Sequence, residues 1–200
     1  MFRLGTISII IFSVFFIACN DEAIPLPKPR IYPKVVYPDK AFEDLNVNTC
    51  PFTLSKPVYF KFKKDSLRLI EEKRFTCWFD LHCAELNSYI HLSYIPIDKS
   101  SPFDELVQDA FELANKHNVK ASARTETRFG IESKNLAGLI FEIDGPVAAP
   151  LQFFVTDSTD HFLRGSLYFN DVVNRDSIQP VYEFLKTDVD RLIESISWTQ

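Results

Sequence analysis

The stretch that decides the fold runs from residue 75 to residue 97 and reads FTCWFDLHCAELNSYIHLSYIPI. Aromatic and β-branched side chains alternate with polar ones in residues 75–81 and again in residues 89–97, which is the period of a half-buried strand. Between these runs, residues 85–88 form a polar interruption of hairpin length. The stretch therefore predicts two antiparallel strands.

Strand-like runs continue on both sides of this pair. The run Val58-Tyr59-Phe60-Lys61-Phe62 precedes it, and further runs follow at residues 120–129, 136–143, 151–156 and 162–169. Turn-forming residues separate the later runs, namely Asn135, Asp144-Gly145-Pro146 and Asp157-Ser158-Thr159-Asp160. We expect the later runs to form a four-stranded antiparallel meander.

Two segments have the three- and four-residue apolar spacing of amphipathic helices. In the first, Ser101 is a candidate N-cap, Pro102 suits the first helical position, and the stripe ends near Asn118. The second begins near Asp176 and ends close to Trp198. This order predicts an α+β fold, with a mostly antiparallel sheet flanked by two long helices.

The N-terminal 18 residues have the composition of an export signal. Arg3 precedes the apolar residues 4–18, a run shorter than the about 20 apolar residues that span a bilayer. Phe16-Ile17-Ala18-Cys19 then places a cysteine directly behind a small residue, where bacterial lipoproteins are cut and acylated. We expect a lipoprotein signal peptide over residues 1–18 and lipid attachment, such as palmitate, at Cys19. A signal peptide cut elsewhere is the alternative.

Residues 19–40 contain five of the twelve prolines, which favours an extended, lipid-anchored tether. Residues 31–37 also carry enough aromatic and aliphatic side chains to pack along the domain, and both alternatives stay open. We expect residues 41–200 to form a single globular domain, because the chain is 46% hydrophobic and 14% aromatic.

Three cysteines follow Cys19 in a chain expected in an oxidising compartment. Cys77 and Cys83 lie six residues apart in one predicted strand, about 20 Å, which is too far for a bridge. A bridge would therefore join Cys50 to Cys77 or to Cys83, with Cys50 and Cys77 as the candidate pair. The alternative is that all three are small buried hydrophobic residues.

Few signals point to catalysis or to nucleic acid. The sequence lacks His-Glu-x-x-His, Gly-x-Ser-x-Gly and phosphate-loop motifs, so we expect no enzyme, no cofactor and no metal site. The net charge is −5 and basic residues are dispersed, so we expect no nucleic-acid partner.

Several polar residues nevertheless have two interpretations. Ser158 and His161 could serve a hydrolase, but residues 157–160 more often build a turn that caps its own backbone. His82 and His91 could face each other across the hairpin, but two ligands do not make a metal site. Arg164 stands inside a predicted strand, where it either pairs with a carboxylate such as Asp157 or Asp171 or is exposed for a partner.

Several segments together resemble one family. They are the Cys19 box, the proline-rich segment, Cys50-Pro51-Phe52, Cys77-Trp78-Phe79, Ile90-His91-Leu92-Ser93-Tyr94 and, most specifically, residues 152–159, 161–170 and 176–178. Over nearly the whole mature chain the sequence resembles the gliding motility lipoprotein family GldD. The order of strands and helices is also similar to small envelope domains of the PsbP and Mog1 type.

The resemblance implies a cell-envelope lipoprotein needed for gliding and tied to the type IX secretion machinery. We expect a non-enzymatic assembly or stabilising factor, anchored in the outer membrane and facing the periplasm, whose partners are envelope proteins of that machinery. An envelope hydrolase, or a module that binds a small ligand or cell-wall fragment, is the alternative. Aromatic and arginine side chains dominate binding hot spots, and the candidate partner-binding residues are Trp78, Tyr94, Ser158 and Arg164.

Overall fold

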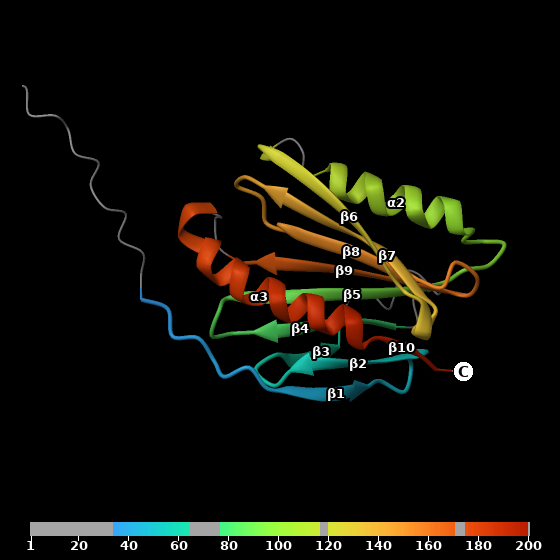
Figure 1. Cartoon of the computed structure of the whole chain (residues 1–200), viewed down its shortest axis with the longest axis horizontal. Coiled ribbons are helices and arrows are strands. Elements are labelled where there is room, and N and C mark those ends of the chain that lie inside the picture. The colour runs from blue at the N-terminus through green and yellow to red at the C-terminus, as the bar shows by residue number, and fades with distance from the viewer. Residues whose placement is uncertain (1–33, 65–76, 117–119, 171–174, 200) are drawn as a thin grey trace, which may run out of the picture. The chain divides into compact units, whose positions relative to one another are not determined.

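The computed structural model describes residues 34–64, 77–116, 120–170 and 175–199, which belong to a compact unit that begins at Pro33 (Figure 1). The strands in these residues are β1 Phe42–Asn46, β2 Phe52–Pro57, β3 Lys61–Lys64, β4 Cys77–Cys83, β5 Ser88–Pro96, β6 Ala123–Ile131, β7 Leu136–Asp144, β8 Leu151–Thr156, β9 His161–Phe169 and β10 Ser197–Trp198. The helices are α2 Phe103–Asn115, the short 3-10 helix η3 Glu132–Lys134 and α3 Arg175–Ser195. In the described ranges, no helix combines the length of a membrane span with sufficient apolar content.

The larger sheet has the strand order β3-β4-β5-β9-β8-β7-β6, and all neighbouring strands are antiparallel. The hairpin predicted from residues 75–97 is the pair β4 and β5, and the predicted meander is β6 to β9. Strand β9 then pairs with β5 from Ser88 opposite Phe169 to Pro96 opposite His161. This pairing joins hairpin and meander into one sheet, and the predicted α+β fold is confirmed.

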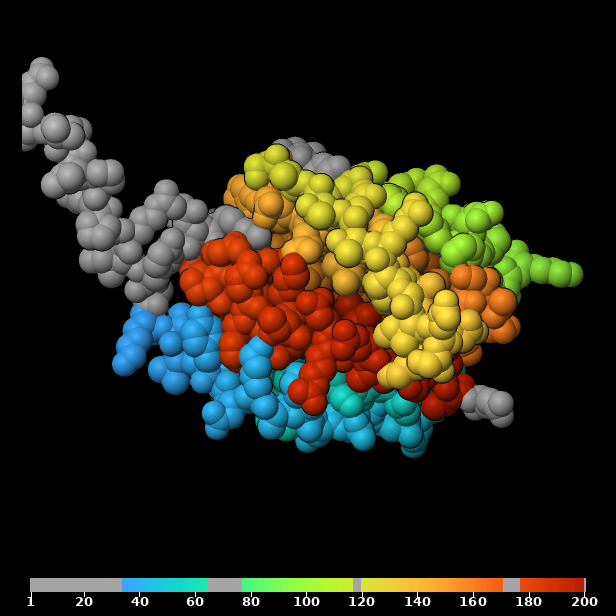
Figure 2. Space-filling view, viewed as in Figure 1, coloured from blue at the N-terminus to red at the C-terminus, as the bar shows by residue number. Residues whose placement is uncertain are grey.

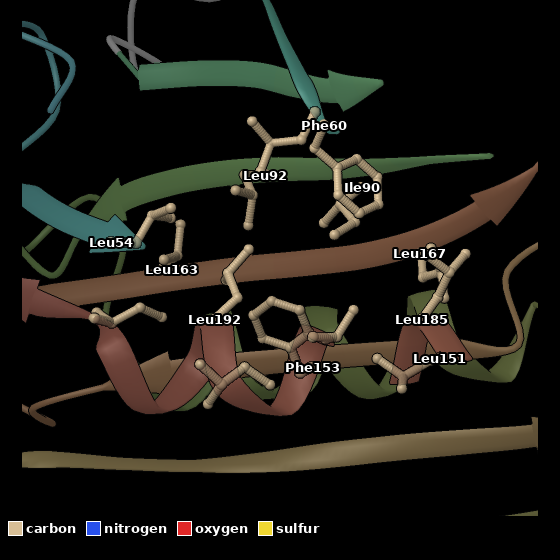
Figure 3. Close-up of a cluster of buried hydrophobic side chains, with 14 of the residues drawn as sticks. Leu54, Phe60, Ile90, Leu92, Leu151, Phe153, Leu163, Leu167, Leu185 and Leu192 are labelled. Atoms are coloured by element: carbon tan, nitrogen blue, oxygen red, sulfur yellow. The ribbon is translucent and has the colours of Figure 1, made fainter. Parts of the chain in front are cut away.

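The two long helices cover opposite faces of this sheet, because side chains alternate along each strand. On β8, Phe153 and Val155 belong to the core beneath α3, whereas Phe154 belongs to a smaller core beneath α2. In Figure 3, Leu185 and Leu192 of α3 reach into the first core. Burial of each such side chain stabilises the fold by about 1.5–3 kcal/mol.

A second sheet, with the order β1-β2-β10, lies beside α3 (Figure 1). Its strand β2 adds Phe52 and Leu54 to the core beneath α3. In the space-filling view, α3 fills the surface between the β1–β2 hairpin and the β6–β7 hairpin (Figure 2). The α3 face is therefore closed by a helix and a small sheet together.

The core beneath α3 is packed tightly enough to require a glycine in β9. Gly165 pairs with Phe153 of β8, and a methyl group on residue 165 would overlap the Phe153 ring. The Phe153 ring occupies the space that a side chain at residue 165 would need, so this position favours glycine over any larger residue. Overpacking of this kind costs about 1–3 kcal/mol.

Residues 35–40 pack along α3. Of the two alternatives for the second half of the tether, these described residues follow the one in which the segment packs along the domain. The Tyr37 ring lies 4.7 Å from that of Phe184, and Lys40 Nζ lies 3.0 Å from the buried carboxylate of Asp188. Tyr59 also donates a hydrogen bond to Asp188. Burial, and then this bond, raise the pKa of the Tyr59 phenol well above its usual range. The predicted signal peptide, Cys19 and the first half of the tether lie outside the described residues.

The structure corrects the sequence-based elements in three places. Residues 58–60 form a turn between β2 and β3 instead of a strand, because the Phe60 N–H donates to the Pro57 carbonyl at 3.0 Å. Ser101 is not the N-cap of α2, since Pro102 occupies that position without a side-chain cap. The sequence-based prediction lacks strands β1, β2 and β10. β1 has little apolar alternation, and the two residues of β10 lie where the sequence predicts the end of the last helix, which instead ends at Ser195.

A disulfide joins Cys50 to Cys77, with Cα atoms 5.1 Å apart, while Cys83 is a free, buried thiol. Cys50 precedes β2 and Cys77 begins β4, so the bridge ties the smaller sheet to the larger one. Next to it, the Phe52 ring contacts the rings of Phe79, Tyr94 and Trp198. Burial raises the pKa of the Cys83 thiol. Of the two bridges that the sequence left open, the structure contains the first.

We expect the double variant Cys50→Ser with Cys77→Ser to lower the free energy of unfolding by about 3–4 kcal/mol, the loop-closure value for cysteines 27 residues apart. Urea denaturation of the oxidised variants measures this loss. The matched control, Cys83→Ala, removes a thiol that is not bridged and should lose about 1 kcal/mol. An equal loss in both variants would contradict the prediction.

Candidate functional site

The candidate site is a cleft of about 440 Å³ between α2 and strands β4, β5 and β9, which we call the α2 cleft. From the sheet it is lined by Trp78, His91, Ser93, Arg164 and Tyr168, together with apolar neighbours. The α2 side supplies Leu106, Asp109, Ala110, Leu113 and Lys116. Asp109 and Lys116 are exposed, so the wall that they form reaches solvent.

Strand alternation and strand register bring these side chains together. Cys77, Phe79 and Leu81 of β4 point into the core beneath α3, so Trp78 and Asp80 point to the α2 side. Trp78 pairs with Ser93 of β5, which in turn pairs with Arg164 of β9. These three residues therefore form one row across the floor of the cleft.

Arg164 is the charged group of this floor. Its Nη2 donates to Oε1 of Gln152 on β8 at 2.7 Å. In the described ranges, no carboxylate forms an ion pair with Arg164. Burial lowers the pKa of its guanidinium, and the charges of Tyr168 and Asp109 act in the other direction and raise it in part. Asp157, a predicted partner of Arg164, binds its own turn instead, and Asp171 lies outside the described residues.

Gln152 holds Arg164 at a cost to the stability of the sheet. The Gln152 side chain is buried, and its Nε2 has no hydrogen-bond partner within the described part of the chain. A buried N–H without an acceptor costs about 1–3 kcal/mol. The amide oxygen of Gln152 fixes the guanidinium, but it is neutral and adds no opposite charge.

Asp80 orients the imidazole of His91 beside this row. His91 Nδ1 donates to Asp80 Oδ1 at 2.7 Å, and His82 Nε2 lies 3.6 Å from Asp80 Oδ2. Burial opposes the charge of Asp80, but the hydrogen bond and charge of His91, with those of His82, hold the Asp80 pKa below its usual range. The two histidines do not face each other, because His82 pairs with Tyr89 and His91 with Asp80. His117 lies outside the described residues, which contain no group of three potential metal ligands.

Tyr94 and Ser158 lie outside the α2 cleft. Tyr94 points into the core beneath α3, where its hydroxyl hydrogen bonds with Nδ1 of His161 at 2.8 Å. Burial, with the charges of Asp157 and Asp160, raises the pKa of Tyr94 to about 12. Ser158 is exposed in the turn between β8 and β9, beside a separate cavity of about 430 Å³. The structure thus brings together Trp78 and Arg164 of the four candidate partner-binding residues.

The turn predicted for residues 157–160 is confirmed. Oδ1 of Asp157 accepts hydrogen bonds from the backbone N–H groups of Thr159, Asp160 and His161 at 2.9–3.0 Å. Burial opposes the Asp157 charge, but these bonds hold its pKa below the usual range. The His161 ring stacks on Trp198, with centroids 4.8 Å apart, and binds Tyr94. The described contacts of His161 therefore serve packing, and they include no hydrogen bond to the Ser158 hydroxyl.

Sequence reasoning missed most of the α2 cleft. The sequence pattern indicates His91 as a possible metal ligand and not as a neighbour of Arg164, and it gives no separate signal for Ser93, Tyr168 or Gln152. The alternating pattern along each strand predicts which of its side chains share one face, but not which strand lies next to it. The missing information was the pairing of β5 with β9, for which no local signal exists.

The sheet with a helix on each face and a polar cleft beneath one of them defines the protein as a small α+β domain, and its sequence has no recognised catalytic motif. Residues 22–198 match the family model described as Gliding motility lipoprotein GldD. The chain belongs to that family. Membership implies a gliding motility lipoprotein, lipid-anchored in the cell envelope, from a family not known as enzymes.

The structure is also similar to the solution structure of cyanobacterial PsbP (CyanoP) from Synechocystis sp. PCC 6803. The sequences are 7% identical, the match covers 80% of this chain and 94% of that chain, and the TM-score is 0.49. We draw no functional statement from this likeness. No curated protein matches the chain.

We expect Asp80→Asn to lower the free energy of unfolding at neutral pH and to have a smaller effect in acid. The folded-state pKa of Asp80 lies below its ordinary value of about 3.9, so its contribution is complete above about pH 5 and is lost as the pH falls through the folded pKa. Urea denaturation at several pH values measures the difference.

The exposed turn carboxylate of Asp160 provides the matched control for this experiment. Asp160→Asn should change the free energy of unfolding by less than about 0.5 kcal/mol at neutral pH. A loss in Asp80→Asn that stays constant from neutral pH to about pH 2 would show that the carboxylate charge is not its source.

Proposed function

We propose that this lipoprotein is a non-enzymatic assembly or stabilising factor of the gliding and type IX secretion machinery. It binds an envelope protein of that machinery through the α2 cleft. Lipid attachment at Cys19, with palmitate among its acyl chains, anchors it in the outer membrane, and the domain faces the periplasm. Family membership supports the motility role, and the composition of the α2 cleft supports a role in binding.

The observation that carries the proposal is the row of Trp78, Ser93 and Arg164 on the floor of the α2 cleft. Tryptophan, tyrosine and arginine are the residues most often responsible for binding energy at protein interfaces. Here Tyr168 joins them in a concave site whose α2 wall reaches solvent. Such a site suits one projecting segment of a partner.

The imidazoles near the candidate site support binding over catalysis. A general base needs a ring that can take a proton from a nucleophile within hydrogen-bond reach. The bond from Nδ1 of His91 to Asp80 leaves Nε2 free within the described residues, as in a general base, whereas His161 is held by Tyr94 and stacked on Trp198. No described hydrogen bond links either ring to a serine hydroxyl.

The attachment of residues 35–40 leaves the α2 cleft accessible in an anchored protein. These residues contact α3 through Tyr37 and Lys40, and α3 covers the sheet face opposite the cleft. The chain therefore enters the domain on the α3 side. A partner can approach the other face without displacing this segment.

We expect Trp78→Ala combined with Arg164→Ala to abolish gliding while the protein stays at its normal level. Truncation of a hot-spot residue costs about 2 kcal/mol or more in binding, and two together remove most of a moderate affinity. Colony spreading and single-cell gliding measure the effect, and an immunoblot reports the protein level. Photo-crosslinking from position 168 should give one discrete envelope-protein adduct that the double variant loses.

The matched control for this experiment is Arg191→Ala on α3. Arg191 is exposed, and its Cζ lies 4.0 Å from the centroid of the Phe42 ring. It belongs to α3, which covers the face of the sheet opposite the cleft. This variant should glide normally and keep the adduct. Normal gliding of a folded Trp78→Ala, Arg164→Ala protein would refute the proposed role of the cleft.

Ser158→Ala separates binding from the hydrolase alternative. The described hydrogen bond of Ser158 uses its backbone N–H, which donates to Thr156 Oγ1 at 2.8 Å, and the substitution keeps that bond. We therefore expect normal gliding and normal protein stability. Loss of gliding at a normal protein level would favour the hydrolase.

A further inference from the structure

We infer that the α2 cleft recognises a carboxylate group that lies next to an apolar side chain on a segment of the partner protein. This inference rests on the proposed function and adds the chemistry of the bound group. Three features of the cleft support it: the charge of Arg164 on the floor, the polar groups beside Arg164, and the apolar walls.

The charge of Arg164 calls for an anion. A partly buried cation is costly unless an opposite charge or several hydrogen bonds compensate for its lost hydration. Within the described residues, its hydrogen bond goes to the neutral amide oxygen of Gln152. Guanidinium has five N–H donors in a planar fork, and that fork fits the two oxygens of a carboxylate.

Two further polar groups lie beside Arg164. Ser93 is directly opposite it on the neighbouring strand, and His91 is two residues along the same face of β5. Neighbouring strands are about 4.8 Å apart, so the Ser93 hydroxyl reaches the same small group as the guanidinium and can donate a hydrogen bond to it. His91 donates its Nδ1–H to Asp80, so the neutral ring presents Nε2 as an acceptor and borders the site without donating to a carboxylate.

The sum of charges around the cleft fits a monoanion. Arg164 and Lys116 are cationic, and Asp109 on α2 faces them as a carboxylate. Asp80 accepts the hydrogen bond of His91 and does not line the cleft. The lining residues therefore carry one net positive charge when His91 is neutral. A carboxylate matches that charge, whereas a phosphate dianion would bring one negative charge in excess.

The walls of the cleft fit an apolar side chain beside that carboxylate. Trp78 and Tyr168 supply rings from the sheet, and Leu106 and Leu113 supply aliphatic surface from α2. The volume of about 440 Å³ lies within the range of pockets that enclose small ligands or a short peptide end. The occupant is thus an apolar segment with one acidic group.

Calorimetric titration of the full chain with matched peptides tests this inference. The probes are acetyl-Leu-Phe with a free C-terminal carboxylate, the same peptide as its amide, and acetyl-Leu-Glu-Phe-amide, in which the carboxylate is internal. We expect at least one carboxylate peptide to bind about 10-fold tighter than the neutral amide, the usual difference for a charge-assisted hydrogen bond. The peptide that binds tells whether the group is a chain terminus or an acidic side chain.

Variants of Arg164 locate the effect. Arg164→Gln should remove the preference for the carboxylate, and Arg164→Lys, which keeps the charge without the fork, should retain part of it. Arg191→Gln, an arginine on the opposite face of the sheet, should leave it unchanged. In nuclear magnetic resonance spectra the indole N–H of Trp78 should shift on binding while that of Trp198, in the core beneath α3, stays in place, and the same spectra show that each variant is folded.

Equal binding of the acidic and neutral peptides, or stronger competition by inorganic phosphate than by acetate, would overturn the inference. If gliding requires Trp78 and Arg164 while the peptides show no carboxylate preference, the proposed function stands and the assigned chemistry is wrong. If the carboxylate peptides bind as expected but folded Arg164→Gln cells glide normally, the chemistry stands and the cleft is not the motility site.

Discussion

The antiparallel pairing of β5 with β9 holds the structure together, because it joins the hairpin β4–β5 to the meander β6–β9. Its register decides which side chains meet on each face. A shift by one residue would move Leu163 and Leu167 out of the core beneath α3 and place Arg164 in it. Gly165 adds a second constraint, since the ring of Phe153 fills the space beside it. One register therefore satisfies the core and creates the row of Trp78, Ser93 and Arg164.

The two faces of the larger sheet are covered to different extents. Beneath α3, apolar side chains from six strands of the two sheets and from the helix form one continuous core. The smaller core beneath α2 uses residues of β7, β8 and β9, and the side chains of β4 and β5 on that face are largely polar or aromatic. The α2 cleft lies at this boundary. Arg164 and Gln152 reduce stability there, which a domain with a large second core can tolerate.

The attachments at the edges of the domain belong to the α3 side. The disulfide of Cys50 and Cys77 ties β2 to β4, and Lys40 and Tyr59 bind Asp188 of α3. Residues 35–40 thus reach the domain through a contact with α3, on the face opposite the α2 cleft. The proposed recognition through the α2 cleft would therefore use a different face from the one that residues 35–40 contact.

Local patterns in the sequence determined the elements: the hairpin, the meander, both long helices, the turn at Asp157 and the placement of Cys77 and Cys83 in one strand. These features depend on side-chain period and turn chemistry within about ten residues. The sequence also singled out Trp78 and Arg164, but as separate residues. Only the tertiary structure decided that β9 pairs with β5, that Tyr94 faces the core, that β1 and β10 complete a second sheet, and that Cys50 bonds with Cys77. Contacts between distant segments depend on how whole faces fit together, and no short stretch of sequence contains that information.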